Sequence, residues 1–400
     1  MLKSNIKRQK YLDRVSPFVD KDIIKVIVGQ RRVGKSYLLY QIMDLIKSRK
    51  RDANIIYVNK EAHEFDRIND YRDLIEYVSS KSVKDAQNYL FLDEIQDISG
   101  FEKGLRALLI KKYDIYCTGS NAHMLSSDLA TNLSGRYVQI PVYSLSYPEF
   151  LEFHGLSADE RSLNKFIKYG GLPYLKNLSL DDETAYDYLR NIYSTIILND
   201  VVKRFSIRHV ELLERLVEYL CDNLGSLLSA KRISDFLKSQ RISISPSVIL
   251  NYLSYLESAF FIFKVKRTEI AGRKIFEVND KYFFQDIGFR HALTGYRQVD
   301  IGKILENIVF SHLQYCGYGI HVGKFGNREV DFVCEKGGDK LYVQVAYLIT
   351  SKDVREREFG NLLKIKDNYR KIVISMDKLA EGSVKGVEHI NILDFLTKFN

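Results

Sequence analysis

Short hydrophobic runs alternate with a stretch of helical spacing in the first 150 residues of the chain. Four runs rich in Ile, Val, Leu, Phe and Tyr have the length of strands. Continuous hydrophobicity over that length is typical of strands buried on both faces of a parallel sheet. Residues 36–50, between the first two runs, repeat apolar positions at the spacing of a helix, so the order predicts an α/β domain. The four runs are residues 23–29, 54–59, 88–94 and 114–120.

Helical patterns dominate residues 151–295. Three stretches of helical spacing are followed by two β-rich runs on either side of Gly272. Three helices and a hairpin in this order predict a winged-helix arrangement, a relative of the DNA-binding helix-turn-helix. The same order fits a helical lid that has no contact with nucleic acid, and the pattern leaves both interpretations open. The three helical stretches are residues 209–226, 229–240 and 245–259.

An α/β pattern returns near residue 300. A helical stretch is followed by two β-rich runs, a charged helical stretch and a third β-rich run, which are residues 304–317, 329–337, 340–348, 351–369 and 370–375. A length of 400 residues favours two or three domains. We therefore expect three domains, at residues 1–150, 151–295 and 296–400.

The composition is that of a globular chain, with 46% hydrophobic and 28% charged residues. The net charge of +9 favours a polyanionic partner such as nucleic acid, although nucleotide phosphates also recruit basic residues. The four cysteines lie far apart and form no CxxC pair, so they read as reduced thiols rather than zinc ligands. We find neither the apolar run of a signal peptide nor 18 consecutive apolar residues, and we expect a cytoplasmic protein without a membrane span.

Residues 29–36 read GQRRVGKS and match the phosphate-binding pattern G-x-x-x-x-G-K-[ST] between a predicted strand and a predicted helix. Glycines allow the tight turn and the close approach of backbone N–H groups to phosphate. Lys35 is expected to reach the β- and γ-phosphates, and the Ser36 hydroxyl to bind Mg²⁺. Arg31 and Arg32 face either phosphate or solvent, since the pattern does not require them. The expected nucleotide contacts are Gly29, Gln30, Arg31, Arg32, Val33, Gly34, Lys35, Ser36 and Tyr37.

Acidic and polar residues follow two other predicted strands. The strand at 88–94 ends in Asp93, expected to bind Mg²⁺, and Glu94, expected to act as general base toward the attacking water. After the strand at 114–120, Ser120 and Asn121 are candidates to hold that water or the γ-phosphate. Arg136 lies at the start of a further β run. It is either a charge that stabilises the transition state or a structural arginine.

With these motifs in this order, the chain resembles prokaryotic AAA+ superfamily ATPases whose C-terminal half is a domain of unknown function. The resemblance implies ATP and Mg²⁺ as ligands and a sheet in which the strand at 114–120 lies between the P-loop strand and the acidic strand. It also implies a winged-helix segment and a C-terminal PD-(D/E)xK restriction-endonuclease-like domain. The later motifs that carry it are YGGLPYL (169–175), LNDVVKRF (198–205), DKYFFQDIGFRHAL (280–293), GKILENIVFSHL (302–313) and REVDFV (328–333).

The implied endonuclease-like site is incomplete in this chain. Such a site uses a helical Glu, a strand Asp and an E-x-K on the next strand to bind Mg²⁺ and activate water. Glu306 and Asp331 match the first two, and Glu329 lies two residues before Asp331. Gln344 and Ala346 stand where E-x-K is expected, and a neutral amide is a poor ligand for Mg²⁺. We therefore predict that this domain does not cleave nucleic acid and that Glu306 and Asp331 make structural hydrogen bonds.

Basic residues flank the predicted winged helix, but the helix at 245–259 carries no Arg or Lys and offers Ser247, Asn251, Tyr252 and Tyr255. This argues for contacts to phosphates rather than to base edges. Non-specific binding to DNA or RNA and a merely solvated basic surface are both open. The basic residues are Lys231, Arg232, Arg241, Lys264, Lys266, Arg267, Arg273 and Lys274.

The sequence thus predicts an ATPase that hydrolyses ATP with Mg²⁺ and couples hydrolysis to a conformational change of its C-terminal half. One alternative is a nucleotide-dependent switch with little turnover. Another is an ATP-regulated DNA nuclease. A homo-oligomer is also open, since Arg136 can act in a neighbouring subunit's site.

Overall fold

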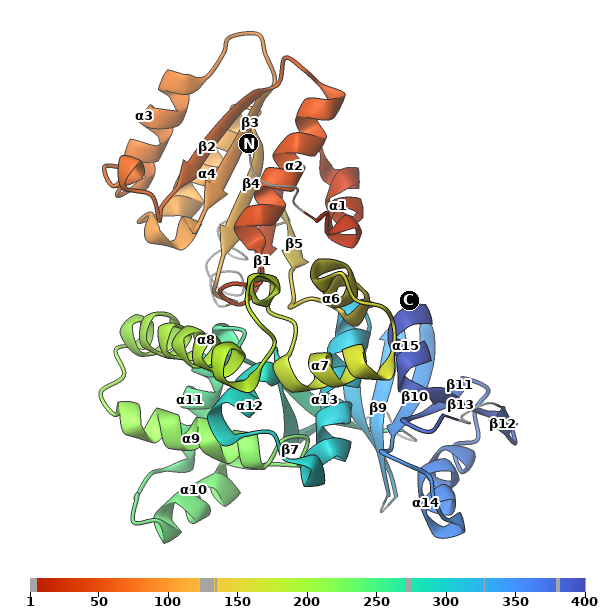
Figure 1. Cartoon of the computed structure of the whole chain (residues 1–400). Coiled ribbons are helices and arrows are strands. Elements are labelled where there is room, and N and C mark those ends of the chain that lie inside the picture. The colour runs from red at the N-terminus through yellow and green to blue at the C-terminus, as the bar shows by residue number, and fades with distance from the viewer. Residues whose placement is uncertain are drawn as a thin grey trace. The chain divides into compact units, whose positions relative to one another are not determined.

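The computed structural model of the chain describes residues 6–122, 133, 135–270, 275–326, 328–378 and 382–399. The chain divides into two compact units (Figure 1). The first unit is Met1–Tyr143 together with Ser258–Phe260. The second unit is Ser144–Glu257 together with Phe261–Asn400.

A parallel sheet forms the centre of the first unit, in the order β2-β3-β4-β1-β5. Strand β4 lies between the P-loop strand β1 and the acidic strand β3, as the resemblance implies. Strands β1 and β4 are buried along their whole length, which explains their continuous hydrophobicity. The strands are β1 Ile24–Val28, β2 Asn54–Asn59, β3 Asn88–Asp93, β4 Asp114–Gly119 and β5 Tyr137–Pro141.

Helices connect these strands and pack against the sheet. Helix α2 follows the P-loop and buries one face, including Leu38, Leu39 and Ile42. Helix α3 starts with a capping box. The side chain of Asp70 accepts a hydrogen bond from the backbone N–H of Asp73, and the side chain of Asp73 accepts one from the backbone N–H of Asp70. The helices are α1 Gln9–Val15, α2 Lys35–Arg49, α3 Tyr71–Lys81 and α4 Phe101–Ile110, with short 3₁₀ turns at Ser16–Phe18, His63–Phe65 and Ile95–Asp97.

The second unit begins with helices that surround the buried helix α12, which contacts α7, α8 and α9. The side chain of Asp286 caps α12 and also accepts a hydrogen bond from the backbone of Gly171, which joins two distant segments. The helices are α6 Tyr147–His154, α7 Glu160–Tyr169, α8 Asp182–Thr195, the π-helical segment Ile196–Lys203, α9 Val210–Asp222, α10 Ala230–Ser239, α11 Pro246–Ser258 and α12 Ile287–Thr294; 3₁₀ turns lie at Pro173–Asn177 and Gln298–Asp300.

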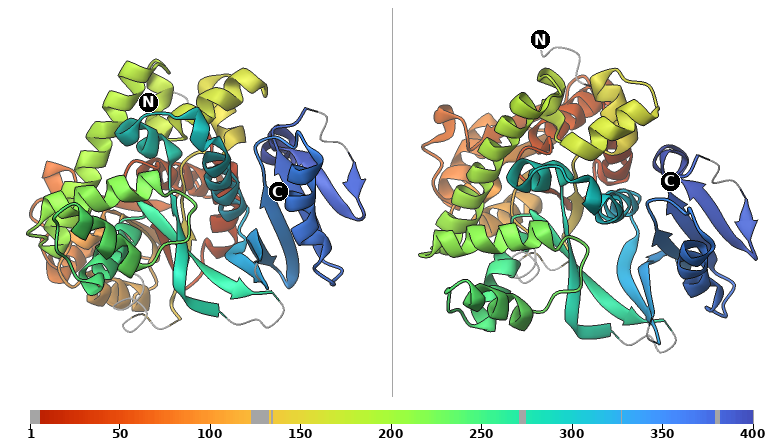
Figure 2. Two further views of the ribbon diagram at one scale, coloured as in Figure 1. Left: turned by 90° about the horizontal axis from the view of Figure 1, so that it is seen from below. Right: turned by 60° about the horizontal axis from the view of Figure 1, so that its bottom comes forward.

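An eight-stranded mixed sheet follows, in the order β12-β13-β11-β10-β9-β8-β6-β7. Strand β6 pairs with β7 as a hairpin and also runs parallel to β8, so Figure 2 shows the hairpin beside the later strands. The strands are β6 Ile262–Glu269, β7 Ile275–Phe284, β8 Gly319–Phe325, β9 Arg328–Lys336, β10 Asp339–Val345, β11 Arg370–Ser375, β12 Ser383–Val384 and β13 Val387–Asn391. Helices α13 Ile301–Tyr315, α14 Lys352–Leu363 and α15 Ile392–Lys398 complete the unit.

The helices and strands predicted in the second unit are present. The β6–β7 hairpin belongs to the eight-stranded sheet and is not a separate wing. The three predicted helices are α9, α10 and α11, and the two β-rich runs are β6 and β7. Because β6 pairs with β8, one sheet continues across the expected domain boundary at residue 296. The winged-helix and endonuclease-like assignments, and the boundary itself, therefore stay proposals.

Two further predictions concern membranes and cysteines. In the described part of the chain, no helix combines the length and apolar character needed to cross a bilayer. All four cysteines are buried and none forms a disulfide. Burial raises the pKa of the Cys117 and Cys221 thiols to about 12.

Candidate active site

The predicted site residues meet at the carboxyl edge of the parallel sheet. Strand register pairs Val28 of β1 with Gly119 of β4, and Leu92 of β3 with Cys117 of β4. The residues that follow each strand therefore emerge at the same edge, which is where ligands bind in open α/β sheets. This edge brings together the P-loop, Asp93 with Glu94, and Ser120 with Asn121.

The two glycines of GQRRVGKS serve separate purposes. Gly29 has a φ of 156°, and a Cβ there would lie 2.2 Å from the carbonyl oxygen of Val142. Gly34 adopts the left-handed conformation, with a φ of 94°, at the N-cap position of α2, where no side chain caps the helix. The first N–H groups of a 15-residue helix are thus left for an anion.

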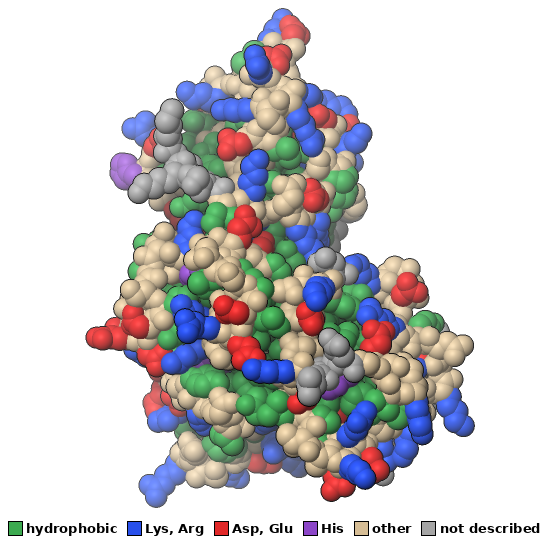
Figure 3. All heavy atoms as spheres, turned by 45° about the vertical axis from the view of Figure 1, so that its right-hand side comes forward, with side chains coloured by type: hydrophobic (Ala, Val, Ile, Leu, Met, Phe, Trp, Pro, Cys, Tyr) green, Lys and Arg blue, Asp and Glu red, His purple; other side chains and the backbone are tan. Residues whose placement is uncertain are grey.

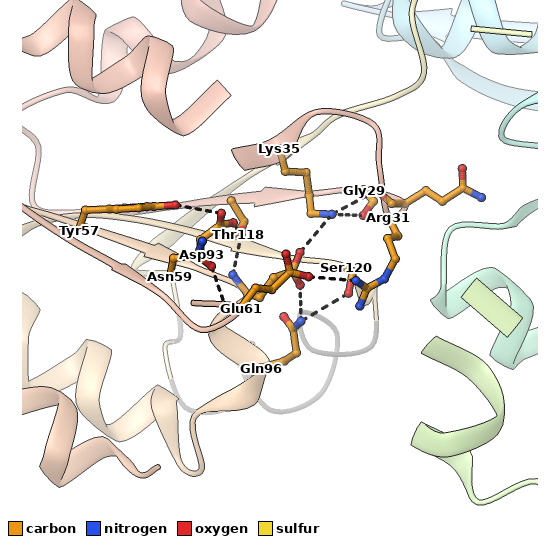
Figure 4. A network of polar contacts seen from close by, with 12 residues as sticks. Gly29, Arg31, Lys35, Tyr57, Asn59, Glu61, Asp93, Gln96, Thr118 and Ser120 are labelled. Carbon is orange, nitrogen blue, oxygen red and sulfur yellow. Dashed lines mark hydrogen bonds and ion pairs between the residues drawn. The ribbon is translucent and has the colours of Figure 1, made fainter. Parts of the chain in front are cut away.

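Lys35 is buried beneath this loop. Its Nζ donates hydrogen bonds to the carbonyl oxygens of Gly29, at 3.1 Å, and Gln30, at 3.2 Å. The same atom lies 3.6 Å from Oε1 of Glu94 (Figure 4). Lys35 therefore bridges the P-loop and the acidic strand, and its three ammonium donors can exchange these acceptors for phosphate oxygens.

Asp93 is 2% exposed and is held from two neighbouring strands. The hydroxyl of Thr118 on β4 donates to Oδ1, and the hydroxyl of Tyr57 on β2 donates to Oδ2 at 3.3 Å (Figure 4). Burial, the hydrogen bond with Tyr40 and the charge of Asp93 raise the pKa of Tyr57, so this hydroxyl remains a donor. Tyr57 had not been predicted to contribute, because it lies within a strand rather than at its end.

Glu94 has a left-handed backbone conformation, with φ and ψ both 54°. Its side chain is held as a carboxylate. Its backbone N–H donates to Oγ1 of Thr118 at 2.9 Å. Burial raises the pKa of Glu94, but the charges of Lys35 and Arg31 and the hydrogen bond from Gln96 outweigh burial, so the pKa is lowered overall. A strained conformation at this position is typical of functional residues.

Gln96 was not identified from the sequence. Its amide Nε2 donates to Oε2 of Glu94 and lies 3.5 Å from Oγ of Ser120 (Figure 4). Gln96 therefore connects the predicted base to the predicted polar residue at the end of β4. The available signal was its position two residues after Glu94 in a short turn.

The remaining P-loop residues differ in their surroundings. Ser36 is partly exposed in the first turn of α2, Tyr37 is 54% exposed, and Arg32 is exposed. Val33 is buried. The side chain of Gln30 is fully buried, and neither of its polar atoms has a partner among the described residues.

Arg8 supports the P-loop and was missed in the sequence. It is 4% exposed, and its Nη1 donates to the carbonyl oxygens of Val33, at 3.0 Å, and Tyr143, at 3.1 Å. A buried guanidinium that donates hydrogen bonds to backbone carbonyl groups stabilises the conformation of the P-loop. A lone arginine in a charged N-terminal segment gave no signal of this role.

Arg136 is not brought together with the other candidates. Its carbonyl oxygen accepts a hydrogen bond from the backbone N–H of Ile24, and the next residue, Tyr137, pairs with Ile24. Arg136 therefore lies at the start of β1, whereas Gly29 follows its end, and five strand residues span about 16 Å. This placement does not support a role in the same chain's site. A role in a neighbouring subunit stays a proposal.

The oxygen and nitrogen donors at this edge fit a nucleotide triphosphate with Mg²⁺. An uncapped helix N-terminus and a buried lysine suit phosphates, and the buried amide of Gln30 has polar atoms without partners in the described structure. A hydroxyl and one buried carboxylate, Ser36 and Asp93, are the oxygen ligands from which Mg²⁺ sites beside phosphates are built. Within the described residues, no group of three or more His, Cys, Asp or Glu side chains is arranged to hold a metal alone.

A second polar cluster lies in the second unit and contains the acids of the expected endonuclease-like site. Lys281 of β7 is 2% exposed. Its Nζ lies 2.8 Å from Glu329, 3.0 Å from Glu306 and 3.7 Å from Asp331. Oδ2 of Asp331 also accepts a hydrogen bond from the backbone of Val345 at 2.8 Å.

This cluster places one ammonium group, that of Lys281, against three carboxyl groups. Burial, together with the mutual repulsion of the carboxylates, raises the pKa of both Glu306 and Asp331 despite the opposing charge of Lys281. Burial lowers the pKa of Lys281, but the three carboxylates raise it more. The ammonium therefore takes the central position among three carboxyl groups. Lys281 lies 50 residues before Asp331 and was not predicted.

The basic surface residues are only partly available for nucleic acid. Lys264 pairs with Asp280 at 3.0 Å. In the expected recognition helix, Tyr252 is buried and Tyr255 stacks on Phe205. Basic and acidic side chains are interspersed on the face that Figure 3 shows. Arg273 and Lys274 lie outside the described residues, whereas Ser247, Asn251, Lys231, Arg232, Arg241 and Lys266 are exposed.

Comparisons with known proteins bear on the family and the fold of the chain. A family model described as an AAA domain matches residues 21–151, and one described as a domain of unknown function (DUF8612) matches residues 160–300. An uncharacterised protein of Haemophilus influenzae is 38% identical over 403 residues, covering 99% of this chain and 100% of that protein. An uncharacterised protein of Methanocaldococcus jannaschii is 32% identical over 357 residues, covering 84% of this chain and 77% of that protein.

Among solved structures, the Walker-type ATPase PABY2304 of Pyrococcus abyssi is similar in fold. The TM-score is 0.50 at 16% sequence identity, over 74% of this chain and 99% of that chain. The AAA domain model and this likeness confirm the predicted P-loop fold. The chain therefore belongs to the same family as the Haemophilus and Methanocaldococcus proteins, and its N-terminal part is an AAA+ P-loop ATPase domain.

Proposed function

We propose that the protein hydrolyses ATP with Mg²⁺ and couples hydrolysis to a conformational change of its C-terminal half. The observation that supports ATP hydrolysis is the convergence of Lys35, Asp93 and Glu94 at one sheet edge, with Lys35 3.6 Å from Glu94. A cation, a buried carboxylate beside it and a polarised base are the groups that phosphoryl transfer to water requires.

Each residue has a separate task in this proposal. Lys35 and the N–H groups at the start of α2 bind the β- and γ-phosphates. Ser36 and Asp93 hold Mg²⁺, which neutralises charge on the phosphate oxygens when bound. Glu94 takes a proton from the attacking water. Gln96 and Ser120 fix the Glu94 carboxylate, and Asn121, buried beside Ser120, is a candidate contact for the water.

Phosphate release from ATP tests the proposal. We expect steady turnover in Mg²⁺ and none in excess EDTA. If the protein binds ATP tightly but releases no phosphate in Mg²⁺ with or without DNA and RNA, it is the nucleotide-dependent switch instead. The pairing of Glu94 with both Lys35 and Gln96 favours the switch, because these contacts occupy the carboxylate that would accept a proton from water.

We propose that the C-terminal domain does not cleave nucleic acid, because Lys281 occupies the centre of its carboxylate cluster. Incubation of plasmid with the protein, Mg²⁺ and ATP tests this. Nicking that disappears in Asp331→Ala would support the nuclease alternative. Contact with DNA or RNA through the exposed Lys231, Arg232 and Lys266 also stays a proposal, and stimulation of ATP turnover by nucleic acid would support it. A cytoplasmic location and a homo-oligomeric state are further proposals.

A further inference from the structure

Arg31, inside the phosphate-binding loop, faces the acidic side of the site. Its Nη1 donates to Oε1 of Glu61 at 3.0 Å, and its side chain is 21% exposed. Glu61 follows β2 and is held in place by its own N–H, which donates to Oδ1 of Asn59 at 2.9 Å. Figure 4 shows the guanidinium turned toward Glu61. Arg31 therefore points across the sheet edge toward β2 and β3 rather than into solvent.

The neighbours of Glu61 tie Arg31 to the reacting groups. Asn59 pairs with Asp93 across β2 and β3, and the backbone N–H of Lys60 donates to the carbonyl oxygen of Asp93 at 3.2 Å. The charge of Arg31 also acts on Glu94, where it adds to the effect of Lys35. The Arg31 guanidinium thus contacts the loop after β2, the strand that pairs with the one ending in Asp93, and its charge acts on the proposed base.

Arg32 is different although it is the next residue. It has a φ of 71° and is exposed, and its side chain makes no hydrogen bond or ion pair with the described residues. The loop therefore directs one arginine into the site and the other away from it.

We propose that Arg31 is a catalytic arginine supplied by the P-loop itself, acting on the γ-phosphoryl group of ATP in the same chain. Glu61 holds the guanidinium before phosphate arrives. An ion pair whose acid is 58% exposed is weak and is readily exchanged for phosphate oxygens, which the planar guanidinium matches in geometry. This inference rests on the proposed ATPase function.

The chemical step assigns Arg31 a role that Lys35 does not fill. Water attacks the γ-phosphorus while the bond to the oxygen bridging the β- and γ-phosphates breaks. The Glu94 carboxylate takes one proton from the water, and the products are ADP and inorganic phosphate. Lys35 binds the ground state as well, whereas Arg31 gains its strongest contact as charge shifts in the transition state, and only such a differential contact raises kcat.

The test compares Arg31→Ala and Arg31→Lys with wild type in ATP turnover and in nucleotide binding. Arg67→Ala is the matched control, since Arg67 is exposed and lies six residues beyond Glu61. We expect Arg31→Ala to lower kcat about 10³-fold, as loss of an arginine finger does, and to change the affinity for ADP less than about threefold. We expect the kcat of Arg31→Lys to lie between those of wild type and Arg31→Ala, because lysine keeps the positive charge and lacks the planar guanidinium. Aluminium fluoride, which with ADP forms an analogue of the transition state, should tighten ADP binding to wild type and should not tighten ADP binding to Arg31→Ala.

Three results would overturn the inference. They are wild-type turnover in Arg31→Ala, an equal loss of turnover in Arg32→Ala, and a loss of ADP affinity as large as the loss of kcat. A wild-type protein without turnover would instead overturn the proposed function, so the two failures are distinguishable. Retention of the far-ultraviolet circular dichroism spectrum in Arg31→Ala confirms that the fold is kept.

Discussion

Lys35 lies 3.6 Å from the carboxylate of Glu94, so the proposed phosphate-binding cation and the proposed general base share one ion pair. Phosphate oxygens that draw Lys35 away remove a charge that lowers the pKa of Glu94. We expect that Glu94 would then be a stronger base when a nucleotide is bound, which would link binding to activation of water.

Removal of the Lys35 ammonium is expected to weaken nucleotide binding strongly and to abolish turnover. Lys35→Ala should weaken ATP affinity at least about 100-fold, since charge-assisted hydrogen bonds to phosphate are lost. Titration with a fluorescent ATP analogue measures this. Lys47→Ala, in the last turn of the same helix, serves as control. ATP affinity in Lys35→Ala equal to that of wild type would refute the assignment of the P-loop lysine.

Gln96 is expected to position Glu94. Gln96→Ala should lower kcat about tenfold and leave ATP affinity unchanged, because a hydrogen bond to the base is lost while the phosphate site is kept. That hydrogen bond lowers the pKa of Glu94, so its loss raises the pKa. The base is active when deprotonated, and the acid limb of the pH–rate profile should therefore move to higher pH. Gln87→Ala is a control in the same unit, and an unmoved acid limb in Gln96→Ala would assign Gln96 no part in catalysis.

Lys281 is expected to be required for the stability of the second unit. Lys281→Met leaves three carboxyl groups without their central cation, and removing one partner of a buried ion pair typically costs about 3–5 kcal/mol. Urea unfolding followed by circular dichroism measures this, since the chain has no tryptophan. Lys266→Met, at an exposed position of the pairing strand β6, should unfold as wild type does.

The loss in Lys281→Met is expected to depend on pH. Burial already raises the pKa of Glu306 and Asp331, and without Lys281 it rises further. Between the unfolded and the raised folded pKa, the folded state holds more protons than the unfolded state, so stability falls as pH rises. Lys281→Met should therefore be more destabilised at pH 8 than at pH 5. A loss independent of pH would show that packing rather than charge explains the effect.

Arg136 lies at the edge of the sheet opposite the P-loop and is expected to act only between subunits. If it does, the wild-type ATPase rate per molecule rises with protein concentration, and the rate of Arg136→Ala stays low and flat. Measurement of turnover from nanomolar to micromolar protein distinguishes the two profiles. A flat wild-type profile matched by Arg136→Ala would make Arg136 a structural residue.

Local pattern in the sequence was enough for the strands and for the residues at their ends. The predicted bounds of β2 and β11 agree with the structure, and Asp93 and Glu94 lie where a buried strand ending in acids places them. Side chains inside elements were harder to assign. Tyr57 reaches Asp93 from the middle of β2, and no spacing rule marks it.

Non-local pairing explains what the sequence did not predict. Strand β6 pairs with β8 more than 50 residues later, so the hairpin that looked like a separate wing belongs to the larger sheet. Lys281 meets Glu306 and Asp331 for the same reason, since the sheet and α13 bring β7 and β9 segments to one place. Hydrophobic periodicity indicates which face of a helix or strand is buried. It does not indicate which other element packs or pairs with it.

Glu94→Gln tests the central claim most directly, with ATP binding and phosphate release measured on the same preparation in Mg²⁺. The substitution keeps the size of the side chain and a hydrogen-bond acceptor, and it removes the negative charge that accepts a proton. We expect ATP affinity to be retained or increased, because Lys35 is no longer paired with a carboxylate, and turnover to fall at least about 100-fold. Turnover in Glu94→Gln equal to that of wild type would contradict the account.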